Sequence, residues 1–156
     1  MNTNPSIRKA HVSDIPLIHR ELGRLGAQGL LLPRPLSELY AHIRDFFIWQ
    51  DPGSDEPSGW CALQILWHDL AEIRSLVVRD KHRHQGIGKH LVEACLDEAR
   101  HLGVTRVFTL TYEIEFFKRL GFRIVDKHIL PQKIWAACLY CSKFPDCDET
   151  AMLLVL

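Results

Sequence analysis

A glycine-rich, basic stretch, HRHQGIGKH at residues 82–90, follows an apolar run that ends at residue 78. The strand-like pattern before it and the amphipathic helix pattern after it put the glycines at a strand-to-helix turn. Glycines let the backbone approach a ligand closely, and the N–H groups that begin a helix attract anions. The stretch therefore predicts a phosphate-binding loop, with an ordinary two-glycine turn as the alternative.

Three phosphate-binding motifs compete for this loop. The P-loop motif G-x-x-x-x-G-K-[ST] fits Gly88 and Lys89 but meets arginine at position 83 and histidine at position 90. The dinucleotide fingerprint G-x-G-x-x-G fits Gly86 and Gly88 but has Leu91 in place of its last glycine. The pattern [RQ]-x-x-G-x-[GA] matches in full over residues 83–88.

This third pattern and its surroundings resemble the GNAT superfamily of acetyl-CoA-dependent N-acetyltransferases. The resemblance covers residues 70–125: a strand, the loop, an amphipathic helix, the strand RVFTLT and a short helix ending in Gly-Phe. In that family the loop wraps the pyrophosphate of coenzyme A, so the resemblance implies acetyl-CoA as cosubstrate. The residues that it assigns to the cosubstrate are Leu76, Val77, Val78, Arg83, His84, Gln85, Gly86, Ile87, Gly88, Lys89 and Phe117.

The strand at 71–78 carries two charged residues. Strand alternation predicts that one face holds Glu72, Arg74, Leu76 and Val78, and that the other holds Ala71, Ile73, Ser75 and Val77. An amine acceptor, with a pKa of ~7.7–8.0 or above, arrives protonated and must lose a proton before it attacks a thioester. We expect Glu72 to take that proton, the alternative being a structural ion pair with Arg74 or another basic residue. Backbone N–H groups near Leu76 are expected to polarise the thioester carbonyl.

The proton for the leaving thiolate needs another donor. Many family members carry a tyrosine acid where this chain has Phe117, which has no proton to give. Thr111 or Tyr112, at the end of the strand 105–111, is expected to supply the proton or a bridging water. For Tyr112 the alternative is a packed surface aromatic.

Several segments resemble the amino-acid N-acetyltransferases, the N-acetylglutamate synthases of arginine biosynthesis, which include short single-domain bacterial forms. These segments are LAEIRSLVV, RVFTLT, EFFKRLGF, LPQK and MLLVL. The resemblance implies acetyl transfer to the α-amino group of L-glutamate, with Glu72 as base and Thr111 near the leaving group. A dicarboxylic acceptor needs cations, and the candidates are Arg34, Arg74 and Lys133, each of which can instead be a surface or structural charge.

Two other functions stay open from the sequence. One is a GNAT acetyltransferase that acts on another small amine or on a protein N-terminus. The other is a CoA-binding sensor without catalysis, for which Glu72 would be dispensable.

The cysteine-rich segment CLYCSKFPDC spaces Cys138, Cys141 and Cys147 as C-x2-C-x5-C. Structural zinc needs four ligands, and nothing in the sequence selects Asp148, His128 or Cys61 as the fourth. We therefore expect reduced thiols here and no metal.

The bulk composition is that of an ordinary globular domain. The chain has 156 residues, 47% hydrophobic and 24% charged, with 19 basic and 19 acidic side chains. A balanced charge disfavours nucleic acid as a partner, and no apolar run approaches the ~18 residues of a membrane span. The N-terminal sequence MNTNPSIRKA has no apolar signal segment, and five cysteines fit reduced thiols, so we expect a cytoplasmic location. The expected partner is a small amino acid substrate, and a homodimer is left open.

The residue patterns predict a mixed α/β fold, the GNAT fold, with a partly parallel sheet in one domain over residues 1–156. Strands are expected at 6–10, 46–50, 60–68, 71–78, 105–111, 122–129 and 151–156. Helices are expected at 13–29, with Ser13 as the N-cap, and at 36–45, 86–103, 113–122 and 131–140.

Overall fold

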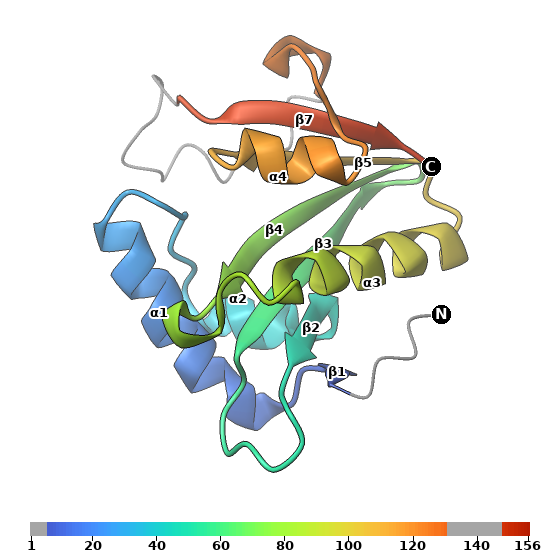
Figure 1. The fold of residues 1–156 in the computed structure, drawn as a ribbon. Helices are drawn as coiled ribbons and strands as arrows, with labels where there is room; N and C mark the ends of the chain where they lie inside the picture. Colours follow the sequence, from blue (N-terminus) through green and yellow to red (C-terminus); the bar gives the residue numbers. More distant parts are fainter. Residues whose placement is uncertain (1–5, 131–147) are drawn as a thin grey trace.

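A mixed sheet lies at the centre of the molecule in this computed structural model, which describes residues 6–130 and 148–156 (Figure 1). Within these residues the sheet has seven strands. In spatial order they are β1 (Ile7–Lys9), β2 (Phe46–Trp49), β3 (Gly59–Trp67), β4 (Leu70–Val78), β5 (Arg106–Thr111), β7 (Thr150–Val155) and β6 (Arg123–Ile124). The β4–β5 pair is parallel and the other described pairs are antiparallel. The mixed α/β class expected from the sequence is confirmed.

Helices cover both faces of this sheet. They are α1 (Ile15–Ala27), α2 (Leu36–Ala41), α3 (Ile87–His101) and α4 (Ile114–Arg119). Helices α1 and α2 share a buried core with Trp60, Ala62 and Val77 of the sheet. Helices α3 and α4 pack on the opposite face, in a core with Cys61 and Leu63. Short 3-10 turns connect these elements: η1 (Val12–Asp14), η2 (Ile43–Asp45), η3 (Asp80–His82) and η4 (Lys127–Ile129).

A β-bulge in β4 changes which side chains face which helices. Ala62 pairs with Arg74 and Trp60 pairs with Val77, so Ser75 and Leu76 stand together opposite Cys61. Ser75 adopts a φ of 57°, a conformation that side chains other than glycine rarely take. The bulge corrects the expected alternation: Val77 joins the core under α1, whereas Leu76 and Val78 pack on the α3 side.

Strands β4 and β5 pair only at their beginnings. Their described register runs from Leu70 opposite Arg106 to Glu72 opposite Phe108. Beyond that point the Thr109 hydroxyl donates to the Ile73 carbonyl at 3.0 Å, and the two strands then separate (Figure 1). The splayed ends of two parallel strands therefore leave a gap in the middle of the sheet.

Three expected elements have different bounds in the structure. The strand expected at 122–129 is limited to Arg123–Ile124, because the Asp126 carboxylate accepts from the His128 N–H at 2.9 Å and begins η4. The N-cap of α1 is Asp14 rather than Ser13, and the helix expected at 36–45 divides into α2 and η2. The helix expected at 131–140 lies outside the described residues.

Candidate active site

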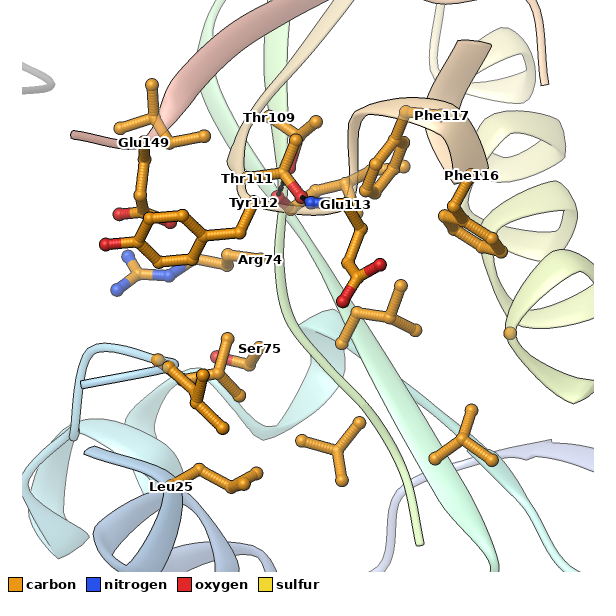
Figure 2. Close-up of a pocket in the computed structure, with 18 of the residues that line it drawn as sticks. Leu25, Arg74, Ser75, Thr109, Thr111, Tyr112, Glu113, Phe116, Phe117 and Glu149 are labelled. Carbon is orange, nitrogen blue, oxygen red and sulfur yellow. Dashed lines mark hydrogen bonds between the residues drawn. The ribbon is translucent and has the colours of Figure 1, made fainter. Parts of the chain in front are cut away.

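A cavity of about 970 Å³ occupies the gap between β4 and β5 (Figure 2). Part of its lining comes from the loop before α3 and from the start of that helix, through Arg83, His84 and residues 86–89. Another part comes from Leu25 of α1 and from residues 30–32, which lead towards α2. The cavity therefore connects the predicted phosphate loop to the middle of the sheet.

The loop before α3 has a backbone suited to anion binding. His84 has φ 67° and Gly86, the N-cap of α3, has φ 78°. No side chain caps the start of α3, so its first N–H groups remain for a ligand. Gly88 packs closely, since an added Cβ would lie 3.4 Å from the Phe116 ring. Gln85 is exposed and does not line the cavity, unlike its neighbours in the motif.

Glu72 lines the cavity at the last position where β4 pairs with β5. Burial raises the pKa of this carboxyl above its ordinary value, and the nearby Glu149 raises the pKa further. The positive charges of Arg74 and Arg34 act in the opposite direction. Among the described residues, no hydrogen bond or ion pair engages the Glu72 carboxylate, which disfavours the ion pair with Arg74. A carboxylate with a raised pKa that opens on a cavity is suited to accept a proton.

Two of the expected acceptor cations differ in their surroundings. Arg74 lines the cavity, and its Nη1 donates to Oε1 of Gln64 on β3 at 2.6 Å. Figure 2 shows its guanidinium beside the Tyr112 ring. Arg34 does not line the cavity: its side chain is 1% exposed, is paired with Glu38 at 3.1 Å and lies over the Phe46 ring. Arg34 therefore influences the site through its charge on Glu72 rather than at the cavity surface.

The hydroxyl groups expected near the leaving thiolate lie at the end of β5. Thr111 is buried, and its Oγ1 accepts from the Glu113 backbone N–H at 2.8 Å. The Tyr112 hydroxyl donates to Asp148 Oδ1 at 2.5 Å. Phe117 is 3% exposed and packs edge-on against Phe116 and Phe122, so it forms an apolar wall of the cavity.

The bulge in β4 also contributes to the lining of the cavity. Leu76, Val77 and Val78 all line the cavity, and their contacts with the cosubstrate stay a prediction. Because two residues of β4 stand opposite one residue of β3, the regular ladder is interrupted near Leu76. A backbone N–H that such a bulge leaves unpaired would be the kind of donor that polarises a carbonyl.

Some cavity residues were not predicted from the sequence. They include Leu25, Ser75, Thr109, Glu113 and Glu149. Ser75 enters through the bulge and Glu149 precedes β7, so neither has a local sequence signal. The three leucines of GLLLP could have been identified from the sequence. An apolar run in a proline-containing loop indicates that the loop packs against another part of the protein or a ligand.

Lys133 and the three cysteines of C-x2-C-x5-C lie outside the described residues, so their roles stay predictions. In residues 6–130 and 148–156 no group of three or more His, Cys, Asp or Glu side chains is arranged to hold a metal ion. None of the helices in these ranges is both long and apolar enough to cross a bilayer.

One cavity joins the uncapped start of α3 to a buried carboxyl group between two splayed strands, a form of site that suits an acyl-group transferase. The acetyltransferase (GNAT) family matches residues 25–122, and the chain belongs to this family. The enzyme class and the fold expected from the sequence are confirmed.

Relatives in sequence point to one group within the family. An uncharacterised N-acetyltransferase of Chlorobaculum tepidum is 39% identical over 150 residues, which cover 96% of each chain. An amino-acid acetyltransferase of Mycobacterium tuberculosis is 38% identical, with 78% of this chain and 70% of the relative covered. An amino-acid acetyltransferase of Neisseria meningitidis is 35% identical over 81% of this chain, but only 29% of that longer protein is covered.

Solved structures agree with this grouping. Rv2747 from Mycobacterium tuberculosis, in complex with CoA and NLQ, has a TM-score of 0.81 at 33% identity, with 97% of this chain and 99% of that chain covered. The N-acetylglutamate synthase from Neisseria gonorrhoeae, in complex with coenzyme A and N-acetyl-glutamate, has a TM-score of 0.85 at 31% identity. That match covers 97% of this chain and 35% of the Neisseria chain. Both relatives hold the coenzyme that the sequence motif predicted.

Proposed function

We propose that the protein transfers the acetyl group of acetyl-CoA to the α-amino group of L-glutamate. The observation that carries the proposal is one continuous cavity that joins the uncapped start of α3 to Glu72 and Arg74. Relatives at 35–38% identity that are named amino-acid acetyltransferases support an amino acid as the acceptor. The solved synthase with N-acetyl-glutamate supports glutamate in particular.

The cosubstrate binds through its phosphates at the loop. The N–H groups around Gly86 and Gly88 hold the pyrophosphate, with added positive charge from Arg83 and Lys89. The pantetheine arm then lies between β4 and β5, which presents the thioester to the bulge. There the N–H near Leu76 donates to the thioester oxygen and stabilises the negative charge that develops on it.

The acceptor binds on the other side of Glu72. The α-carboxylate of the acceptor pairs with Arg74. Its ammonium group lies near Glu72, which removes one proton. The neutral amine attacks the thioester carbon, and the tetrahedral intermediate expels the thiolate of coenzyme A. We assign protonation of that thiolate to the Thr111 hydroxyl, because the Tyr112 hydroxyl already donates to Asp148. A thiol with a pKa near ~8.5 leaves readily, so this step needs only modest help.

A panel assay tests the proposal. Thiol release from acetyl-CoA is measured with each of the twenty amino acids, and kcat/KM is then compared for glutamate, aspartate and glutamine. We expect the highest kcat/KM for glutamate. Turnover only with other amines, or with a peptide N-terminus, would replace glutamate with one of those acceptors. Binding of acetyl-CoA without any turnover would favour a CoA sensor.

A further inference from the structure

Ser75 lies at the bulge of β4 in a strained conformation that faces the cavity. Its φ of 57° is costly for a residue with a Cβ, and a glycine would adopt it freely. The side chain is 8% exposed and lines the cavity. Among the described residues no hydrogen bond to its hydroxyl is present, and the hydroxyl oxygen is not one of the fully buried polar atoms, so it is accessible from the cavity that Ser75 lines. The Ser75 hydroxyl is therefore available to bind a ligand in the cavity.

The bulge brings Ser75 to the same side of the cavity as Arg74. In a regular strand these adjacent residues would point to opposite faces of the sheet. Figure 2 instead shows Ser75 next to Arg74, on the side of β4 that faces Leu25. Arg74 uses Nη1 for Gln64, which leaves its other guanidinium donors for a ligand. A hydroxyl donor and a guanidinium therefore face one region of the cavity.

We propose that the Ser75 hydroxyl, together with the Arg74 guanidinium, binds the α-carboxylate of the acceptor amino acid. This inference rests on the proposed function and adds a residue that fixes the orientation of its substrate. Residues two apart in a strand are about 6.6 Å apart, since each residue rises about 3.3 Å. An α-amino acid with its ammonium at Glu72 can therefore extend its carboxylate towards Arg74 and Ser75.

Two substitutions separate the hydroxyl from the strain. Ser75→Ala removes the hydroxyl and keeps the Cβ, whereas Ser75→Gly removes both the hydroxyl and the conformational cost. A hydrogen bond to a charged group has a strength that corresponds to an about 10- to 100-fold loss of kcat/KM for glutamate in both variants. The KM for acetyl-CoA should change less than about twofold. The melting temperature should rise by about 2–4 °C in Ser75→Gly and not in Ser75→Ala.

An acceptor analogue tests the group that the hydroxyl recognises. Isoglutamine, in which an amide replaces the α-carboxylate, should be a poor acceptor for the parent enzyme. The preference for glutamate over isoglutamine should narrow in Ser75→Ala, because that variant has lost a donor that favours the carboxylate. A purely structural serine would leave this ratio unchanged.

The outcomes are distinguishable from a failure of the proposed function. A parent that acetylates glutamate, with Ser75→Ala and Ser75→Gly at parental kcat/KM, would overturn the Ser75 assignment alone. An equal rise of KM for glutamate and acetyl-CoA would overturn it as well, because the effect would not be specific to the acceptor. A parent with no turnover on any amino acid would overturn the proposed function and this assignment together.

Discussion

The Glu113 backbone N–H donates a hydrogen bond to the Thr111 hydroxyl oxygen at 2.8 Å, where β5 gives way to α4 (Figure 2). With that oxygen engaged as an acceptor, the hydroxyl hydrogen of Thr111 is free to point towards a second acceptor. Thr111 is 7% exposed and lines the cavity, so a ligand in the gap can supply that acceptor. The contact therefore prepares Thr111 to donate towards the leaving thiolate.

Replacement of the Thr111 hydroxyl by a methyl group should slow the reaction. We expect Thr111→Val to lower kcat by about 10-fold, a modest loss because a thiolate leaves without much assistance. Thr111→Ser keeps the hydroxyl and should retain kcat within about twofold. Steady-state kinetics at saturating glutamate make the comparison. Equal kcat for Thr111→Val and the parent would remove Thr111 from the mechanism.

A carboxylate placed in the phosphate loop should block the cosubstrate. Gly86 has φ 78° and an added Cβ would meet no atom within 4 Å, so Gly86→Asp changes the charge and the backbone energy without a clash. Its carboxylate would repel the pyrophosphate and compete for the N–H groups at the start of α3. Calorimetric titration with acetyl-CoA should show an at least 100-fold weaker Kd.

Gly53 provides the matched control for this substitution. It has φ 81°, is equally unobstructed and lies in the β2–β3 loop, away from the cavity. Gly53→Asp imposes a comparable backbone cost but should leave the affinity for acetyl-CoA unchanged. The loop assignment fails if the two variants lose affinity to the same extent, or if neither loses it.

Glu72→Gln should reduce activity and increase stability. Loss of the base should lower kcat by about 10²–10⁴, and the loss should shrink at high pH, where the acceptor amine is already neutral. The pKa of Glu72 is raised in the folded state, so the folded protein binds more protons than the unfolded chain in the window just above the ordinary carboxyl pKa. Stability therefore falls as the pH rises through this window, and the loss persists above it.

Glutamine does not titrate, so it avoids this loss. The melting temperature of Glu72→Gln should exceed that of the parent at neutral pH, and the difference should disappear in acid, below the ordinary carboxyl pKa. Thermal unfolding across pH measures both values. A lower melting temperature for Glu72→Gln at neutral pH would mean that the carboxylate stabilises the fold, as an ion pair would.

The strand-to-helix loop at residues 83–88 was predictable from the sequence because its determinants are local. The motif over residues 83–88 combines glycines, a helix start and a preceding strand, and each of these is set by neighbouring residues. The position of Glu72 was predictable for the same reason, since alternation holds from Leu70 to Arg74. Beyond Arg74 the prediction of faces was wrong, because a serine with positive φ inserts a bulge that no local pattern indicates.

Arg34 illustrates a second limit. The sequence offers Arg34 as a cation for the acceptor, but a carboxylate four residues later, Glu38, pairs with it. That i, i+4 spacing was a readable signal, since α2 begins at Leu36. Whether the guanidinium then faces the cavity or the core depends on its packing against Phe46. Phe46 lies on β2, outside the loop that holds Arg34, so the local sequence does not indicate this contact.

Two substitutions should move the acid limb of the kcat profile in opposite directions. Arg34 lowers the pKa of Glu72, so Arg34→Gln should raise that pKa and shift the limb to higher pH. Glu149 raises the same pKa, so Glu149→Gln should shift the limb to lower pH. Arg100→Gln and Asp97→Asn, from an exposed pair on α3, remove one charge of each sign and should leave the limb in place. Shifts of the same sign for Arg34→Gln and Glu149→Gln would exclude Glu72 as the group that titrates, because opposite charges must act on one carboxylate with opposite signs.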